Sequence, residues 1–253
     1  MPAQPGVPAI VALALLVALA VGAAAVGRLR TERQIASAAL RAVLQLALVS
    51  LVIALVLRSM AWSMVFVLAM FAVAVVITTR RIGVPGAWPW AALAMAAGIA
   101  PVLAVVFATG AVPFRAAALV PFAGIIIGGT MNAHSLAGRR VIGALREQWN
   151  TCEAALALGL LPRDAIDLVA LRLVPEALVP GMDQTRTVGL VTLPGAFVGV
   201  LLGGGSALQA AMAQVLVLVG LLGAQTLTVV TEFRVIRTGR LLPADLAGRI
   251  SAG

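Results

Sequence analysis

The sequence contains no lysine and no tyrosine, and it has one cysteine and one histidine among 253 residues. A Gly-rich phosphate-binding loop requires a lysine, so this chain cannot itself be a P-loop ATPase. Cys152 has no second thiol in the chain, which excludes an intramolecular disulfide and a thiolate metal cluster. No acidic residue stands at a sequence position that obviously orients His134, and no Ser-His-Asp constellation is present. We therefore expect no enzymatic activity.

Charged residues are also scarce. They make up 11% of the chain, whereas 62% of the residues are hydrophobic and the mean hydropathy is +1.10. Because roughly 20 apolar residues cross a hydrocarbon core of about 30 Å, uncharged windows of that length mark candidate spans. The sequence thus predicts an all-α, polytopic integral membrane protein with about seven transmembrane helices. The windows are Pro8–Gly27, Ser37–Leu57, Ala61–Thr79, Pro89–Thr109, Ala116–Leu136, Val188–Gly203 and Leu208–Thr231.

The arginines follow the odd-numbered windows, and the connections after the even-numbered windows hold few or none. The positive-inside rule then places the N-terminus outside and the C-terminus in the cytoplasm. A net charge of +9 would suit nucleic acid, but no soluble domain is available to display a basic face. We expect the lipid bilayer as partner, no nucleic acid, and a multi-pass location in a bacterial inner or plasma membrane.

One long polar interruption, residues 137–187, separates the fifth and sixth windows. It predicts a short helix over Cys152–Leu158 that ends at Gly159, and a second helix that begins at Pro162. In the second helix apolar residues recur at helical spacing, while charged residues fall largely on the other side. Such an amphipathic segment is typical of a helix that lies against a membrane or a partner. The apolar residues are Ile166, Val169, Ala170, Leu173 and Ala177.

Two motifs resemble those of a known family. Glu153-Ala154-Ala155, with Gly159 after it, is similar to the opening of the EAA loop of ABC-transporter permeases. The run Thr187-Val188-Gly189-Leu190-x-x-Leu193-Pro194-Gly195 resembles the permeases of FetB-type iron-export ABC transporters, which also include plant aluminium-sensitivity membrane proteins. Further similar stretches are Arg41-Ala42-Val43-Leu44-Gln45-Leu46 and the set Ala123, Gly124, Gly128 and Met131.

The resemblance implies a single permease domain over residues 1–253, with residues 137–187 as its cytoplasmic coupling loop. It implies a homodimer that pairs with separate ATPase subunits and exports metal ions such as iron. No cofactor would bind directly, because ATP and Mg would enter through the partner ATPase. Ala196, Phe197 and Val200 stand where family members often carry methionine or glutamine, which puts iron in doubt. The implied coupling residues are Glu153, Ala154, Ala155, Gly159, Pro162 and Asp164.

Other residues are candidates for the translocation path, each with a structural alternative. Arg41 either snorkels to headgroups or faces a cavity together with Gln45. His134 is either a histidine near the membrane interface or a metal- or proton-linked group. Asp183 either caps a helix or pairs with an arginine, or it binds a transported cation. A kink at Pro194-Gly195 would place the sixth span near the path. The full set is Arg41, Gln45, Met131, His134, Asp183, Thr192, Pro194 and Gly195.

Three other functions remain open at this point. The chain could be an ABC permease for a non-metal substrate, a secondary transporter or channel that works without ATP, or a structural membrane subunit. Few ionisable groups fall inside the predicted spans, which argues against a proton- or ion-coupled carrier. An ATPase gene next to this one would favour an ABC permease over the secondary transporter and the structural subunit.

Overall fold

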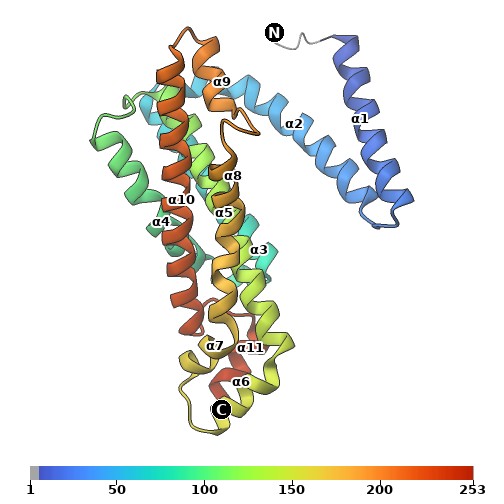
Figure 1. Cartoon of the computed structure of the whole chain (residues 1–253), viewed down its shortest axis with the longest axis vertical. Helices are drawn as coiled ribbons and strands as arrows, with labels where there is room; N and C mark the ends of the chain where they lie inside the picture. The colour runs from blue at the N-terminus through green and yellow to red at the C-terminus, as the bar shows by residue number, and fades with distance from the viewer. Residues whose placement is uncertain (1–5, 253) are drawn as a thin grey trace. The chain divides into compact units, whose positions relative to one another are not determined.

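The computed structural model describes residues 6–252 and divides the chain into two compact units, Met1–Arg58 and Ser59–Gly253. Nearly all described residues are helical, and an isolated bridge between Val188 and Thr192 is the one β-type pairing among them. This confirms the prediction of an all-α fold. Figure 1 shows the helices of each unit.

The first unit is a hairpin of two apolar helices, α1 (Val7–Val26) and α2 (Glu32–Val56). Both are long and apolar enough to cross a membrane, and most of their large hydrophobic side chains are exposed. In the connecting turn Arg28 and Arg30 have φ angles of 52° and 56°, in the left-handed region that non-glycine residues seldom adopt. The charged residues of this unit lie at the turn, on α2 and at its end.

The second unit is built around four long helices: α3 (Met60–Ile82), α4 (Trp88–Ala108), α5 (Ala116–Glu147) and α10 (Ala207–Arg237). The short 3-10 turn η1 (Pro85–Ala87) joins α3 to α4. Helix α10 packs along both α4 and α5, and α3 also packs on α5. Within a bilayer, van der Waals packing and polar contacts hold such helices together, because lipid is as apolar as the side chains.

Two of these helices are longer than a membrane is thick. At about 1.5 Å per residue, the 32 residues of α5 and the 31 of α10 are each close to 48 Å long, against about 30 Å of hydrocarbon. Their extra turns lie at the end where α6 (Trp149–Ala157), α7 (Pro162–Ala170) and α11 (Ala244–Ala252) gather in Figure 1. We refer to this group of short helices as the coupling end, because α6 and α7 belong to the predicted coupling loop.

The sixth predicted span is not one continuous helix. After α7 the chain forms η2 (Leu171–Leu178), α8 (Val179–Thr187) and then, beyond residues 188–194, the eight-residue α9 (Gly195–Leu202). The helix stops because Val188 is extended, Gly189 is left-handed with φ +79°, and Pro194 lacks an N–H to continue the ladder. Six helices in the described part of the chain are long and apolar enough to cross a membrane by themselves. The number of crossings and their orientation stay predictions.

Candidate translocation path and coupling end

Helix α8 lies beside the interior of a membrane-spanning helix. A Cβ added to Gly181 of α8 would collide with the side-chain oxygen of Gln225 on α10, so the two helices touch at this point. Gln225 precedes Arg237, the last residue of α10, by 12 residues (237 − 225), or about 18 Å. Residues 179–187 end the loop 137–187 that the sequence predicts to be cytoplasmic. In the structure they pack against the middle of α10, as Figure 1 shows.

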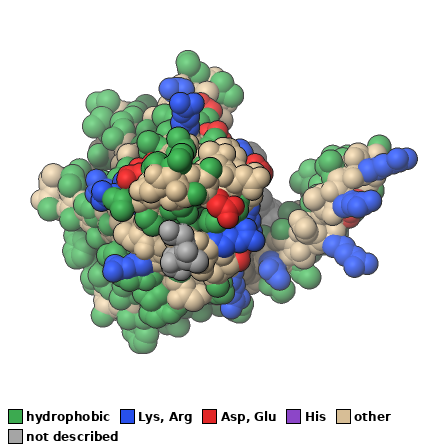
Figure 2. All heavy atoms as spheres, turned by 90° about the horizontal axis from the view of Figure 1, so that it is seen from below, with side chains coloured by type: hydrophobic (Ala, Val, Ile, Leu, Met, Phe, Trp, Pro, Cys, Tyr) green, Lys and Arg blue, Asp and Glu red, His purple; other side chains and the backbone are tan. Residues whose placement is uncertain are grey.

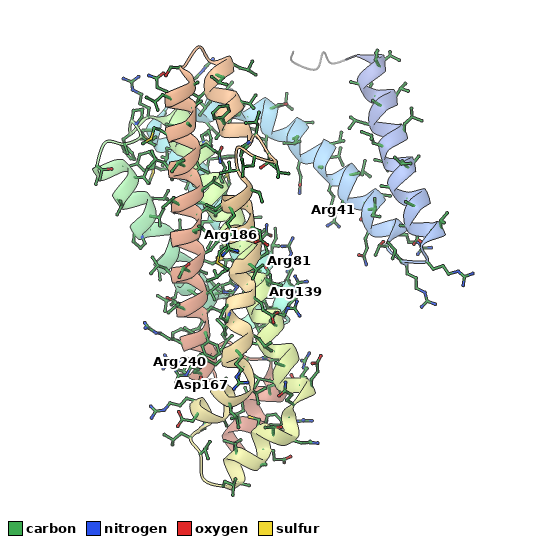
Figure 3. The ribbon with its side chains drawn as sticks, in the orientation of Figure 1. Arg41, Arg81, Arg139, Asp167, Arg186 and Arg240 are labelled. Atoms are coloured by element: carbon green, nitrogen blue, oxygen red, sulfur yellow. The ribbon has the colours of Figure 1, made fainter. Side chains whose placement is uncertain are left out.

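This helix carries exposed charge. Nη1 of Arg186 lies 3.6 Å from Oδ1 of Asp183, and these side chains are 73% and 60% exposed. The hydroxyl of Thr187 donates to the carbonyl oxygen of Asp183. In Figure 3 the labels of Arg186, Arg81 of α3 and Arg139 of α5 follow one another downward along the second unit. Charged groups beside a membrane-spanning helix face a bundle interior or a water-filled cavity and not lipid, so the exposed side of α8 is a candidate path surface.

The break after α8 leaves backbone N–H and C=O groups without partners in a helix, and some of these groups form hydrogen bonds within the break. The N–H of Gly189 donates to the carbonyl of Thr192, and the carbonyl of Thr187 accepts from Leu190 and Val191. A pocket of about 350 Å³ lies between the break and α10, with Leu193, Pro194, Phe197 and Gln214 in its lining. The side-chain oxygen of Gln214 is buried there without a hydrogen-bond partner among the described residues.

The predicted path residues fall into three places. Asp183, Thr192, Pro194 and Gly195 belong to the one segment that contains α8 and the break, and Met131 is half-buried on α5. His134 lies in the interior of the four-helix core, away from the exposed side of α8. Arg41 and Gln45 lie on α2 of the first unit, where both are exposed. The predicted kink at Pro194-Gly195 is a complete break, with Pro194 directly before the first residue of α9.

A buried polar cluster surrounds His134. Its acidic member is Glu232, a residue that the sequence does not single out. Nδ1 of His134 lies 3.4 Å from Oε1 of Glu232, and both side chains are 0% exposed. The Thr78 hydroxyl lies 3.0 Å from the same Nδ1 and 2.8 Å from the Ser135 hydroxyl. The sequence shows no acid at a position that obviously orients His134, because α10 brings in Glu232 from 98 positions away (232 − 134). A glutamate within two helical turns of the predicted end of the last span was the available indication.

Polar side chains of α10 are seated against glycines of the neighbouring helices. Thr228 lies against Gly98 of α4, and Glu232 lies against Gly138 of α5. Gln225 lies against Gly181 of α8 and donates from Nε2 to the carbonyl of Gly129 on α5, at 3.1 Å. The absence of a Cβ lets the helices approach closely enough to enclose these polar groups, as small residues do at membrane helix interfaces.

At the coupling end the structure supports the local part of the sequence prediction. Gly159 has φ +87° and ends the turn after α6, and Pro162 is the first residue of α7. Glu153 and Ala154 are exposed, whereas Ala155 is buried against the rest of the unit. The helix after Gln148 begins at Trp149, three residues before the predicted start at Cys152.

Ion pairs tie the coupling end to the long helices. Oδ2 of Asp167 in α7 lies 2.8 Å from Nη2 of Arg237 in α10. The Asp167 side chain is 25% exposed and the Arg237 side chain is 33% exposed. Arg140 of α5 pairs with Glu176 of η2 at 3.3 Å, and Asp164 pairs with its neighbour Arg163 at 3.6 Å. The half-buried Asp167–Arg237 pair links the end of α10 directly to α7.

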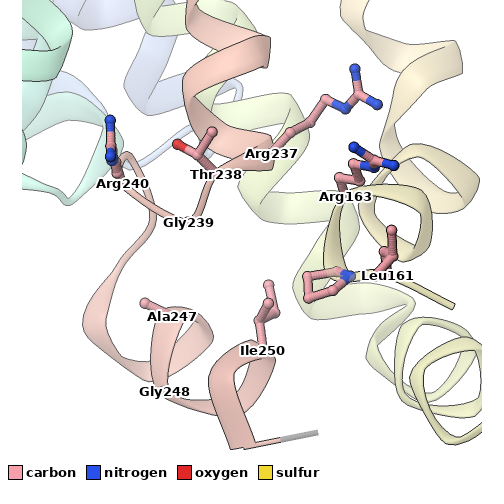
Figure 4. Close-up of a pocket in the computed structure, with 10 residues that line it drawn as sticks. Leu161, Arg163, Arg237, Thr238, Gly239, Arg240, Ala247, Gly248 and Ile250 are labelled. Atoms are coloured by element: carbon pink, nitrogen blue, oxygen red, sulfur yellow. The ribbon is translucent and has the colours of Figure 1, made fainter. Parts of the chain in front are cut away.

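A pocket of about 730 Å³ opens beside this ion pair, between α7, the end of α10 and α11. Figure 4 shows Arg163, Arg237 and Arg240 around it, together with Thr238 and Ile250. The Arg240 guanidinium stacks over Trp90 at 4.4 Å from the ring centre. Figure 2, seen from below, shows arginines and acidic residues among hydrophobic side chains on this face.

Cys152 is fully buried in α6, and its burial raises the pKa of the thiol. A buried thiol with a raised pKa is not a reactive one. In the part of the chain that the structure describes, no three residues of the His, Cys, Asp and Glu types gather closely enough to hold a metal ion.

Comparison with known proteins adds the family. Residues 7–238 match the family described as "Uncharacterised protein family (UPF0014)". The chain belongs to this family. It is 34% identical over 221 residues to the UPF0014 membrane protein STAR2 of Oryza sativa subsp. japonica, a match that covers 86% of this chain and 78% of STAR2. No solved structure matches it.

Two further relatives carry more specific names. The UPF0014 chain is 32% identical over 143 residues to the probable iron export permease protein FetB of Escherichia coli, which covers 55% of this chain and 53% of FetB. It is 35% identical over 120 residues to Protein ALUMINUM SENSITIVE 3 of Arabidopsis thaliana, which covers 47% of this chain and 44% of that protein. The resemblance found in the sequence is therefore confirmed, and the chain is a multi-pass protein of a membrane permease family.

Proposed function

We propose that this UPF0014 protein is the transmembrane permease subunit of an ABC exporter, driven by a separate ATPase subunit and exporting metal ions such as iron. The observation that carries the proposal is the position of α8. A helix with an exposed Asp183–Arg186 pair packs beside the middle of α10 and then breaks at residues 188–194. Broken helices with polar ends at membrane depth are the usual form of transporter binding sites.

The coupling end supports an external source of energy. The α6–α7 pair exposes Glu153 and Ala154 next to a left-handed glycine turn, a small and rigid surface suited to docking. Motion of α7 would reach α10 through the Asp167–Arg237 ion pair, and α10 in turn contacts α8 at Gly181. Force applied at the coupling end thus has a continuous route to the charged helix.

The proposal of a metal ion as substrate is supported by one relative and by one side chain. FetB is named a probable iron export permease, and the Asp183 carboxylate is the acidic group on the exposed side of α8. Hard cations prefer such oxygen ligands. Phe197 and Val200 beyond the break supply no soft ligand. One chain offers too few ligands, so a second copy whose α8 faces the first would complete the path and cover its charge.

The test is ATP hydrolysis by the permease reconstituted in lipid vesicles with its proposed ATPase subunit. We expect iron(II) to stimulate hydrolysis, and Asp183→Asn to lower this stimulation about tenfold or more, as expected when roughly 1.4 kcal/mol or more of cation interaction is lost. The control is Glu32→Gln on α2 of the first unit, an acidic residue outside both α8 and the coupling end, which should leave stimulation intact. Hydrolysis that does not respond to iron would remove iron as substrate, and failure to bind any ATPase would remove the ABC assignment.

A second candidate is a proton-coupled secondary transporter. The argument against it from the sequence was the scarcity of ionisable groups in the spans. The buried His134–Glu232 pair weakens this argument, because it places two such groups inside the four-helix core. Transport by vesicles that contain the permease alone, driven by a pH gradient, would favour this candidate over the first.

A further inference from the structure

The His134–Glu232 pair lies where three membrane-spanning helices meet. His134 is on α5, Glu232 on α10 and Thr78 on α3, and all three side chains are 0% exposed. Glu232 is packed so closely against α5 that a Cβ on Gly138 would lie 2.8 Å from its Oε1. The side chain is therefore fixed in a dense contact and cannot turn out to solvent.

The carboxyl group receives no hydrogen bond. Neither oxygen of Glu232 has a hydrogen-bond partner among the described residues, and Nε2 of His134 has none either. An ionised carboxylate in an apolar interior would need several donors or a close cation. Charge-assisted N–H···O bonds measure about 2.7–2.9 Å. The 3.4 Å between His134 Nδ1 and Glu232 Oε1 is too long for a histidinium–carboxylate pair of this kind.

Other charges nearby do not neutralise the group. On α3, Arg81 is directed to Asn132, with 3.3 Å between Nη1 and Oδ1. On α5, Arg139 donates to the carbonyl of Ser135, and Arg140 pairs with Glu176 of η2. Arg234 of α10 is exposed, and α4 contains no titratable residue. Among the described residues, His134 is the one basic side chain within 4 Å of the Glu232 carboxyl group.

We propose that Glu232 holds a proton in this closed arrangement of the bundle, beside a neutral His134, so that the pair is a proton-binding site buried in the four-helix core. A proton fits where a metal ion does not, because it needs no added volume and no third or fourth ligand. The site gives up its proton when α10 separates from α5 and admits water. The proposal stands whether or not an ATPase drives transport.

The test is infrared spectroscopy of the purified permease at neutral pH. A protonated carboxyl group gives a C=O stretching band that ionised carboxylates lack. We expect one such band in the wild-type protein, its shift when glutamate is labelled with ¹³C, and its loss in Glu232→Gln. The label needs no substitution, so the result does not depend on a variant that folds. The other four glutamates are exposed or half-exposed, and Glu176→Gln serves as the matched control that keeps the band.

A wild-type spectrum without a glutamate-sensitive band would overturn the proposal, because the carboxyl group would then be ionised. A band that persists in Glu232→Gln but disappears in Glu176→Gln would also overturn it, by placing the proton on another residue. Neither outcome bears on the ABC assignment, which is tested by ATP hydrolysis with the partner.

Discussion

At the scale of single residues, the interior of this protein depends on glycines as much as on its polar groups. Each of Gln225, Thr228 and Glu232 on α10 fills the space that a glycine on a facing helix leaves open. In water such polar groups would be solvated, but in a bilayer they have to be enclosed by protein. Substitution of the glycine is therefore a more specific test of this packing than removal of the polar group.

The first prediction concerns Gly98. A Cβ at Gly98 would collide with Thr228 and with the backbone carbonyl of Ala224, so Gly98→Ala must push α4 away from α10. We expect a loss of about 1–3 kcal/mol in the free energy of unfolding, which is typical of overpacking. The measurement is unfolding in mixed detergent micelles, followed by circular dichroism.

The control is Gly128→Ala on α5, where an added Cβ meets no atom within 4 Å. This substitution should be neutral or stabilise the helix by about 0.5–1 kcal/mol, because alanine is a better helix former than glycine. Equal destabilisation by both substitutions would contradict the proposed close contact between α4 and α10.

At the scale of elements, the coupling end contains a left-handed glycine turn between the two short helices α6 and α7. Gly159 stands at φ +87°, a conformation that costs other residues roughly 1–2 kcal/mol. We predict that Gly159→Val reorients α6 against α7 and abolishes co-purification with the partner ATPase, while membrane insertion is kept. Affinity purification from co-expressing cells measures the first effect, and membrane fractionation measures the second.

Gly110→Val is the matched control. Gly110 also has a left-handed φ, of +71°, and open space around it, but it lies in the turn between α4 and α5, outside the coupling end. The backbone cost is thus similar, and ATPase binding should survive. Loss of binding in both variants would mean that general destabilisation, and not the shape of the coupling end, is responsible.

The sequence predicts local elements well and contacts between distant ones poorly. The sequence predicts Gly159 and Pro162 as the end and the start of helices, and the structure agrees, because glycine and proline act through their own backbone. The sequence predicts only a kink at Pro194-Gly195, whereas the structure has a break over residues 188–194, since the number of residues left out of the helix depends on how α9 packs on α10. The Glu232–His134 contact joins residues far apart in the chain, and no local pattern encodes it.

At the scale of the whole molecule, the number of crossings depends on the broken segment. Six helices of the described chain can span a membrane unaided, and α8 with α9 would make the seventh crossing in two parts. Seven crossings place the two ends of the chain on opposite sides, whereas six place them on the same side. The distribution of arginines predicts opposite sides, with the C-terminus in the cytoplasm.

Reporter fusions test this prediction in a bacterial host. Green fluorescent protein added after residue 253 should fluoresce, because it folds in the cytoplasm. A protease-sensitive tag placed before residue 1 should be cleaved by protease added outside intact spheroplasts. A tag of the second kind that is protected, together with a fluorescent C-terminal fusion, would mean an even number of crossings.

The length of α10 has a mechanical consequence. The helix runs without a proline from the pocket at the break, where Gln214 lies, to Arg237 in the ion pair with Asp167. A stiff rod of this kind acts as a lever: a small tilt imposed at one end appears as an opposite displacement beyond the pivot. The tight contacts at Gly98, Gly138 and Gly181 lie between the two ends and form the natural fulcrum. Substituting larger residues for these glycines would therefore change the stability of the protein. It would also change how far the break at residues 188–194 opens for a given displacement of the coupling end.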